Sequence, residues 1–186
     1  MSFLKKLLFA SLTVFSFSCA PISTFQSPAI EDNFLIGFGY GLLPFSSMMD
    51  INVWYRLPLS SRWEYGMRAG LFEGLSIDLK YNFLQSFILA SGDLSFTPVE
   101  GNTYISPMIL VGTKRIYGGY KLAYPITTWE AEPLRIIMIG ATIGNKIRIM
   151  PEINFWNELD NPKKIEVTYG LGIAFSISGK SKEKQK

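Results

Sequence analysis

The chain has 186 residues, a net charge of +3, one cysteine and no histidine. These numbers exclude a histidine base, a histidine-ligated metal, a cysteine-cluster metal site and an intrachain disulfide. Charged residues are only 18% of the chain and aromatic residues 15%, yet no mature segment has the roughly 18 unbroken apolar residues of a membrane-spanning helix. This combination favours strands over helices, and the absence of a concentrated basic patch argues against nucleic acid as a partner.

The first 18 residues have the pattern of a secretory signal peptide. Two lysines precede an apolar stretch at residues 7–17, which is too short for a stop-transfer helix. Cys19 follows and resembles the lipobox cysteine of bacterial lipoproteins, which becomes the first mature residue and carries acyl groups, although Ser16 stands where that family has leucine. We expect lipidation at Cys19, with ordinary signal cleavage near this point as the alternative.

Residues 19–32 are rich in proline, serine and threonine and are expected to form a lipid-tethered linker. After this linker, apolar and polar residues alternate in one segment after another, most clearly at residues 75–83. Alternation gives a strand one apolar and one polar face. Ten strands are expected, at residues 33–42, 48–57, 62–71, 74–84, 86–96, 102–112, 114–124, 134–143, 146–156 and 165–178.

Most of these segments have the roughly nine to eleven residues that a tilted strand needs to cross a bilayer. The sequence therefore predicts an all-β fold, a closed antiparallel up-and-down transmembrane β-barrel at residues 33–178, with a polar, lysine-rich tail at residues 179–186. Merging two weak strands would give eight strands instead of ten. Short connections alternate with longer ones, as in outer-membrane barrels with short periplasmic turns, so both termini are expected on the periplasmic side.

The polar strand faces carry many small residues and nearly balanced charges, which suits a crowded interior better than a water-facing surface. Buried charges persist only when they are paired and hydrogen-bonded. We therefore expect the apolar faces to point outward to lipid, and the charges to form a paired network in a narrow lumen. The expected network comprises Asp50, Arg56, Glu64, Arg68, Asp78, Lys80, Asp93, Arg115, Lys121, Arg148, Glu152 and Glu166.

Two further features bear on the barrel. Aromatic residues near the strand ends are typical of interfacial girdles: Tyr40, Tyr55, Trp63, Phe83, Phe87, Tyr124 and Trp156. Pro107 and Pro151 lie inside expected strands, where proline removes a ladder donor, so they predict β-bulges.

With these features, residues 33–178 resemble small bacterial outer-membrane β-barrel proteins, particularly compact ones with lipoprotein-like signals. The resemblance rests on the alternation, on the Gly-Phe-Gly-Tyr-Gly run at residues 37–41 and on the Tyr-Gly-Leu-Gly-Ile-Ala-Phe run at residues 169–175. It implies the outer membrane of a Gram-negative bacterium, with outer-membrane lipids and, during insertion, the barrel-assembly machinery as partners. The family usually ends in a terminal aromatic residue, whereas here the polar tail follows.

No catalytic residue, metal site or cofactor is predicted. Barrel lipases, proteases and deacylases depend on a histidine base, which this chain lacks, and a carboxylate pair of Asp78 with Glu64 is expected to be ion-paired with Arg68 and Lys80. The expected function is a non-enzymatic structural or surface-interaction role. The alternatives are a soluble periplasmic lipoprotein with a lipocalin-like barrel that binds an apolar ligand, and a histidine-free barrel enzyme acting on lipids. The oligomeric state is not predicted.

Overall fold

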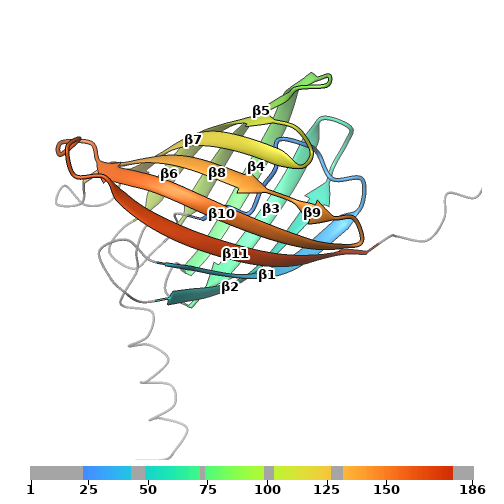
Figure 1. Ribbon diagram of the computed structural model, residues 1–186, viewed down its shortest axis with the longest axis horizontal. Coiled ribbons are helices and arrows are strands. Elements are labelled where there is room, and N and C mark those ends of the chain that lie inside the picture. Colours follow the sequence, from blue (N-terminus) through green and yellow to red (C-terminus); the bar gives the residue numbers. More distant parts are fainter. Residues whose placement is uncertain (1–22, 43–48, 72–73, 99–102, 127–131, 178–186) are drawn as a thin grey trace, which may run out of the picture.

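The computed structural model describes residues 23–42, 49–71, 74–98, 103–126 and 132–177. Its strands are β1 (Phe34–Leu42), β2 (Met49–Pro58), β3 (Trp63–Gly70), β4 (Gly74–Gln85), β5 (Leu89–Thr97), β6 (Tyr104–Gly112), β7 (Ile116–Pro125), β8 (Leu134–Ala141), β9 (Ile143–Gly144), β10 (Ile147–Glu158) and β11 (Glu166–Ile177). Neighbouring strands pair antiparallel, and the sheet closes because β11 pairs with both β10 and β1 (Figure 1). Among the described residues, no helix is long and apolar enough to cross a membrane.

The barrel has ten strands, because β9 continues β8. Both segments pair with β10 in one register, since Glu152 lies opposite Gly140 and Arg148 lies opposite Gly144. Eleven strand segments therefore form a closed antiparallel barrel of ten strands. The prediction of an all-β barrel is confirmed, and ten strands is the correct alternative rather than eight.

The two ends of the barrel differ in their connections. We call one end the short-turn end; it carries residues 59–62, 86–88, 113–115 and 145–146, and also the start of β1 and the end of β11. The other, the long-loop end, carries residues 159–165 and four connections that lie wholly or partly outside the described residues. This arrangement follows from the even number of strands, which returns the chain to the end where β1 began.

Strand β4 shows how alternation separates the two faces of the sheet. Asp78 and Lys80 point into the barrel and are buried, whereas Ile77 and Leu79 point outward and are 38% and 42% exposed. The same alternation along the other strands leaves a largely aliphatic and aromatic exterior. The predicted outward orientation of the apolar faces is therefore confirmed.

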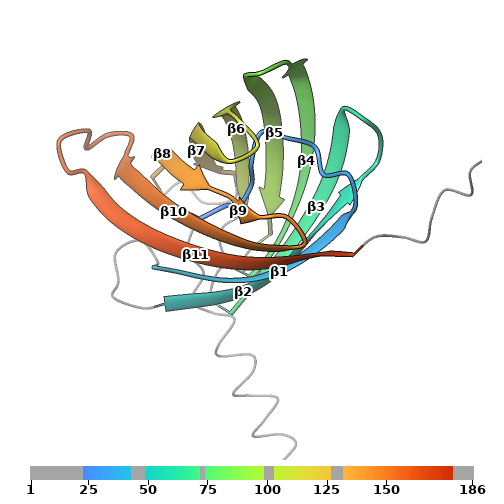
Figure 2. The ribbon, with the colours of Figure 1, turned by 45° about the vertical axis from the view of Figure 1, so that its right-hand side comes forward.

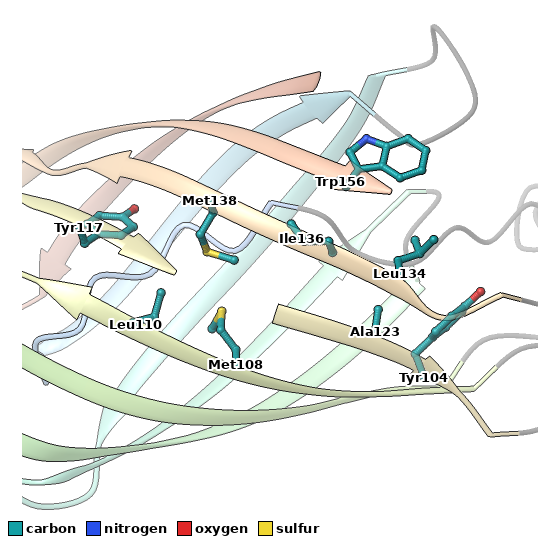
Figure 3. Close-up of a cluster of buried hydrophobic side chains, with 9 residues drawn as sticks. All are labelled: Tyr104, Met108, Leu110, Tyr117, Ala123, Leu134, Ile136, Met138 and Trp156. Carbon is teal, nitrogen blue, oxygen red and sulfur yellow. The ribbon is translucent and has the colours of Figure 1, made fainter. Parts of the chain in front are cut away.

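Strand β8 is apolar on both faces, and together with residues of β6, β7 and β10 it lines part of the inside of the barrel with apolar side chains. On β8, Ile136 and Met138 are fully buried, whereas Ile137 and Ile139 are exposed on the outside. Figure 3 shows the inward cluster, which comprises Tyr104, Met108, Leu110, Tyr117, Ala123, Leu134, Ile136, Met138 and Trp156. This side of the interior is therefore largely apolar, although Lys121 and Glu152 also lie on it, and the charged residues of β2 to β5 face it.

The expected bulges at the two prolines are wrong. The pairing of β6 with β7 skips the residues opposite Pro107 and resumes in the same register, and the break between β8 and β9 lies opposite Pro151. A missing N–H removes a ladder hydrogen bond without inserting a residue, so the register is kept. The register shift that does occur lies in β4, where Phe83 is the extra residue between Asn82 and Leu84.

Most of the expected aromatic girdle lies on the exterior. Tyr55 is half-buried, and the following residues are exposed: Tyr40, Trp63, Phe83, Phe87 and Tyr124. Trp156 is an exception, because it shares the inward face of β10 with Glu152 and Asn154 and is only 2% exposed. Its assignment to the girdle is wrong, because position near a strand end does not decide which face a side chain occupies.

Candidate functional site

The interior of the barrel is occupied by the chain's own N-terminal residues. Residues 23–31, which we call the plug segment, are buried apart from the half-buried Ile30, and Figure 2 shows this segment in blue inside the ring of strands. These residues of the expected lipid-tethered linker are therefore buried inside the barrel. A segment rich in serine, threonine and proline can lie in a polar lumen as well as in water, provided that side chains of the barrel strands form hydrogen bonds with its backbone N–H and C=O groups.

The plug segment runs from the long-loop half of the barrel toward the short-turn end. Ser23 contacts the region of Gly41 and Gly170, and Asn154 Nδ2 donates to Ser23 Oγ at 3.2 Å. Glu31, at the other end of the segment, pairs with Arg148 near the start of β10. Ser23 thus lies near the long-loop end of β1 and β11, and Glu31 lies near the short-turn end.

Glu152 of β10 binds the start of the plug segment. Its carboxylate accepts hydrogen bonds from the backbone N–H of Thr24 at 2.9 Å, from that of Phe25 at 3.0 Å and from Thr24 Oγ1 at 3.2 Å. Two successive backbone donors aimed at one carboxylate form a charge-assisted contact of the stronger kind. Glu152 therefore accepts hydrogen bonds from backbone N–H groups that would be bound by water in an exposed linker.

Strands β3 and β4 bind the end of the plug segment from the opposite wall. Lys80 forms an ion pair with Glu64 at 2.7 Å and donates to the carbonyl oxygens of Ser27 at 3.1 Å and Ala29 at 2.8 Å. Glu64 Oε2 also accepts from the Glu31 backbone N–H at 2.8 Å. One buried ion pair thus satisfies three backbone groups of the plug segment.

Arginines of β2 and β3 also bind the start of the plug segment. Arg56 forms an ion pair with Asp78 and also donates to the carbonyl oxygen of Thr24 at 3.4 Å. Arg68 donates to the carbonyl oxygen of Ser23. The void left at this level is about 10 Å³, which is about the room that one water molecule needs. Among the described residues, the plug segment and the side chains around it therefore leave little free space in this cavity.

Phe25 fills a recess that three glycines create on β1 and β11. A Cβ atom added at Gly39 would lie 2.5 Å from the Phe25 ring, and Cβ atoms added at Gly170 and Gly172 would lie 3.0 Å and 3.1 Å from it. Gly41 borders Ser23 in the same way. The inward glycines therefore make room for the plug segment rather than for an open channel.

The structure places most of the expected charge network inside the barrel. The buried members are Asp50, Arg56, Glu64, Arg68, Asp78, Lys80, Asp93, Lys121 and Glu152, and Arg148 is half-buried at the short-turn end. Gln26 of the plug segment donates to Asp93 at 3.3 Å. Several members thus contact the plug segment as well as one another.

Two residues are wrongly assigned to that network. Arg115 is exposed in the turn between β6 and β7, because the strand begins only at Ile116. Glu166 lies at the first position of β11, where it pairs with Lys164 at 2.8 Å, and this contact raises the pKa of the Lys164 ammonium group. Both are at barrel ends, which alternation alone cannot distinguish from the interior.

Sequence reasoning missed the contribution of Thr24, Phe25, Gln26 and Glu31, because they lie outside any alternating segment. A usable signal exists in the facing strands, where inward glycines leave a volume that the barrel wall cannot fill. Cys19, the signal segment, residues 20–22 and the tail at residues 179–186 lie outside the described residues. Lipidation at Cys19 therefore stays a prediction.

Two cavities flank the plug segment at the short-turn end. One has a volume of about 460 Å³ and the other about 790 Å³, and both are bordered by residues 29–32 and by Lys114. Among the described residues, no group of three or more acidic or cysteine side chains is placed to hold a metal ion. The arrangement can therefore seal a lumen in its middle while leaving polar space at one end.

No protein-family model matches the chain, and no curated protein matches it. A solved structure described as "NanC porin structure in rhombohedral crystal form" is similar in fold, with a TM-score of 0.51 and 11% sequence identity. The match covers 77% of this chain and 100% of that chain. The fold is that of a porin-like β-barrel. At this identity the likeness extends to the fold alone.

Proposed function

We propose that the chain is a non-enzymatic outer-membrane β-barrel, sealed by its own N-terminal residues, with a structural or surface-interaction role. The observation that carries the proposal is the combination of an apolar exterior with a charged lumen that the plug segment fills. Apolar surface on this scale is unstable in water, and a closed ladder leaves no unpaired strand edge in lipid. The partners of the proposal are outer-membrane lipids and, during insertion, the barrel-assembly machinery.

The lumen favours this role over a lipocalin-like one. A barrel that binds an apolar ligand needs an apolar cavity inside and a polar surface outside, whereas here nine charged residues of the expected network are buried inside. The apolar inward cluster of β6 to β8 and β10 is itself packed among the strands, and the cavity beside Arg56 and Asp78, with about 10 Å³, is too small for a ligand. In the proposed orientation the short-turn end faces the periplasm, as is usual for outer-membrane barrels.

Conductance measurements test the sealed lumen. The refolded barrel in a planar lipid bilayer is expected to show no stepwise conductance, because the plug segment closes a lumen that ten strands alone would leave partly open. A variant that lacks residues 23–31 is expected to show discrete conductance steps, and a variant that lacks residues 179–186 is expected to stay silent. Stepwise conductance of the intact barrel would contradict the proposal.

The membrane location is tested on the exterior of β4. Changing Leu79 to arginine is expected to lower the free energy of unfolding by about 2–4 kcal/mol, because it places a charge in hydrocarbon. The measurement is a urea titration of the barrel refolded in lipid vesicles. Leu79→Phe is the matched control and is expected to stay close to the parent protein. Equal stability of the two variants would show that this face is not in lipid.

A further inference from the structure

The cavity of about 460 Å³ at the short-turn end is lined by more cations than anions. The turn between β6 and β7 contributes Lys114 and Arg115, and the turn between β9 and β10 contributes Lys146. Residues of both turns line this cavity, and the backbone N–H of Thr142, just before β9, donates to the Arg115 carbonyl oxygen at 2.7 Å. Three basic residues from adjacent turns therefore border one space.

Three cations of these turns have no ion-pair partner among the residues that the structure describes. Arg148 pairs with Glu31 at 2.6 Å, so these two lining residues balance each other. Within the described ranges, Lys114, Arg115 and Lys146 have no ion-pair partner, and Asp32 is the remaining lining acid. Like charges that share a concave site repel one another, and the site attracts an anion.

The borders of this cavity are held in place before any ligand arrives. The plug segment forms one border and is fixed there by the contacts of Lys80 and Glu64. In the turn between β6 and β7, Thr113 Oγ1 accepts from the backbone N–H of Arg115 at 3.2 Å and of Ile116 at 3.1 Å. A preformed site loses less conformational entropy on binding than a mobile one.

The adjoining cavity of about 790 Å³ has a different lining. It shares Lys114 with the first cavity and is bordered by hydroxyl and amide side chains, among them Ser60, Ser61 and Gln85. Such groups donate and accept hydrogen bonds and suit a hydroxylated ligand. The two cavities together offer a space with three unpaired basic residues beside a polar space in which Lys114 is the one basic residue among the described lining residues.

We propose that the short-turn end binds a phosphate ester with a hydroxylated body, with the phosphate against Lys114, Arg115 and Lys146. Guanidinium and ammonium groups form short, charge-assisted hydrogen bonds with phosphate oxygens. The hydroxylated part of the ligand lies toward Ser60 and Ser61. This chemistry has two sources, a soluble phosphate ester and the headgroup of an anionic phospholipid in the surrounding leaflet.

The test measures binding of glycerol 3-phosphate to the intact barrel, refolded in zwitterionic detergent micelles, by isothermal titration calorimetry at low salt. The double variant Lys114→Gln/Lys146→Gln is expected to bind about tenfold more weakly or worse, because it loses two charged donors. Lys163→Gln/Lys164→Gln removes the same charge at the long-loop end and is expected to bind like the parent protein. Lys114→Arg/Lys146→Arg keeps the charge and is expected to retain binding.

Phosphatidylglycerol added to the micelles separates the two sources. If it competes with glycerol 3-phosphate while phosphatidylcholine does not, the site takes a lipid headgroup; if it does not compete, the site takes a soluble ester. The proposal is overturned if neither compound binds saturably, or if the variants of the two ends weaken binding equally. Heat-modifiable gel mobility confirms that each variant is folded.

Discussion

Changing Lys80 to methionine is expected to lower the free energy of unfolding by about 3–5 kcal/mol. The Lys80 ammonium group is only 1% exposed, and it faces Glu64 as well as the carbonyl oxygens of Ser27 and Ala29. Its removal leaves a buried carboxylate without its counter-charge and two buried carbonyl groups without a donor. Urea titration of the barrel in lipid vesicles measures the loss.

A second substitution shows how much of this loss comes from the stranded charge. In Lys80→Met/Glu64→Gln the residue at position 64 is neutral but still offers an oxygen to the Glu31 backbone N–H. The double variant is expected to be more stable than Lys80→Met alone by about 1 kcal/mol or more. If it is no more stable, the ion pair does not contribute as the geometry indicates. Lys163→Met on the exposed connection at the long-loop end should change stability by less than about 0.5 kcal/mol.

The sequence predicted the wall of the barrel because the wall depends on local alternation. In β4, the period of two assigns Asp78 and Lys80 to one face and Ile77 and Leu79 to the other, and the structure agrees. Even β8, which is apolar on both faces, is a recognisable strand by its length and branched residues. Strand number follows from counting such segments, and it was correct.

The partners within the lumen could not be predicted, because they depend on register and on strand ends. Alternation places Glu64, Arg68 and Lys80 inside, but only the register of β3 against β4 sets Glu64 directly opposite Lys80. Arg68, which was expected near the carboxylates of Asp78 and Glu64, also donates to the carbonyl oxygen of Ser23, a contact that the charge pattern does not predict. A charge pattern in sequence therefore identifies the members of a network, but it does not give the contacts among them.

The plug segment could not be predicted from its own residues. Its composition is that of a linker, and nothing local distinguishes backbone groups bound by water from backbone groups bound by Glu152 or Lys80. The information lies in the residues that surround it, since inward glycines on β1 and β11 leave space in a wall of otherwise ordinary side chains. A recess of this kind predicts that another part of the chain occupies it, but it does not identify the segment.

Changing Phe25 to alanine tests whether this side chain fills the glycine recess. The change is expected to lower the free energy of unfolding by about 3–5 kcal/mol. The Phe25 ring is 1% exposed and lies against Gly39, Gly170 and Gly172. Its loss leaves a cavity that the glycines cannot fill, because they have no side chains. The same urea titration in vesicles measures the change.

The effect of Gly39→Ala on stability is expected to depend on whether Phe25 is present. Gly39→Ala alone is expected to cost about 1–3 kcal/mol, because its Cβ atom would lie 2.5 Å from the Phe25 ring. In the Phe25→Ala background the same change should be neutral or stabilising, because the ring is gone and alanine suits a strand better than glycine. Gly92→Ala is the matched control, since its Cβ atom would have its nearest neighbour at 4.0 Å. If Gly39→Ala costs the same in both backgrounds, Phe25 does not occupy the glycine recess, and the segment that seals the lumen is a different one.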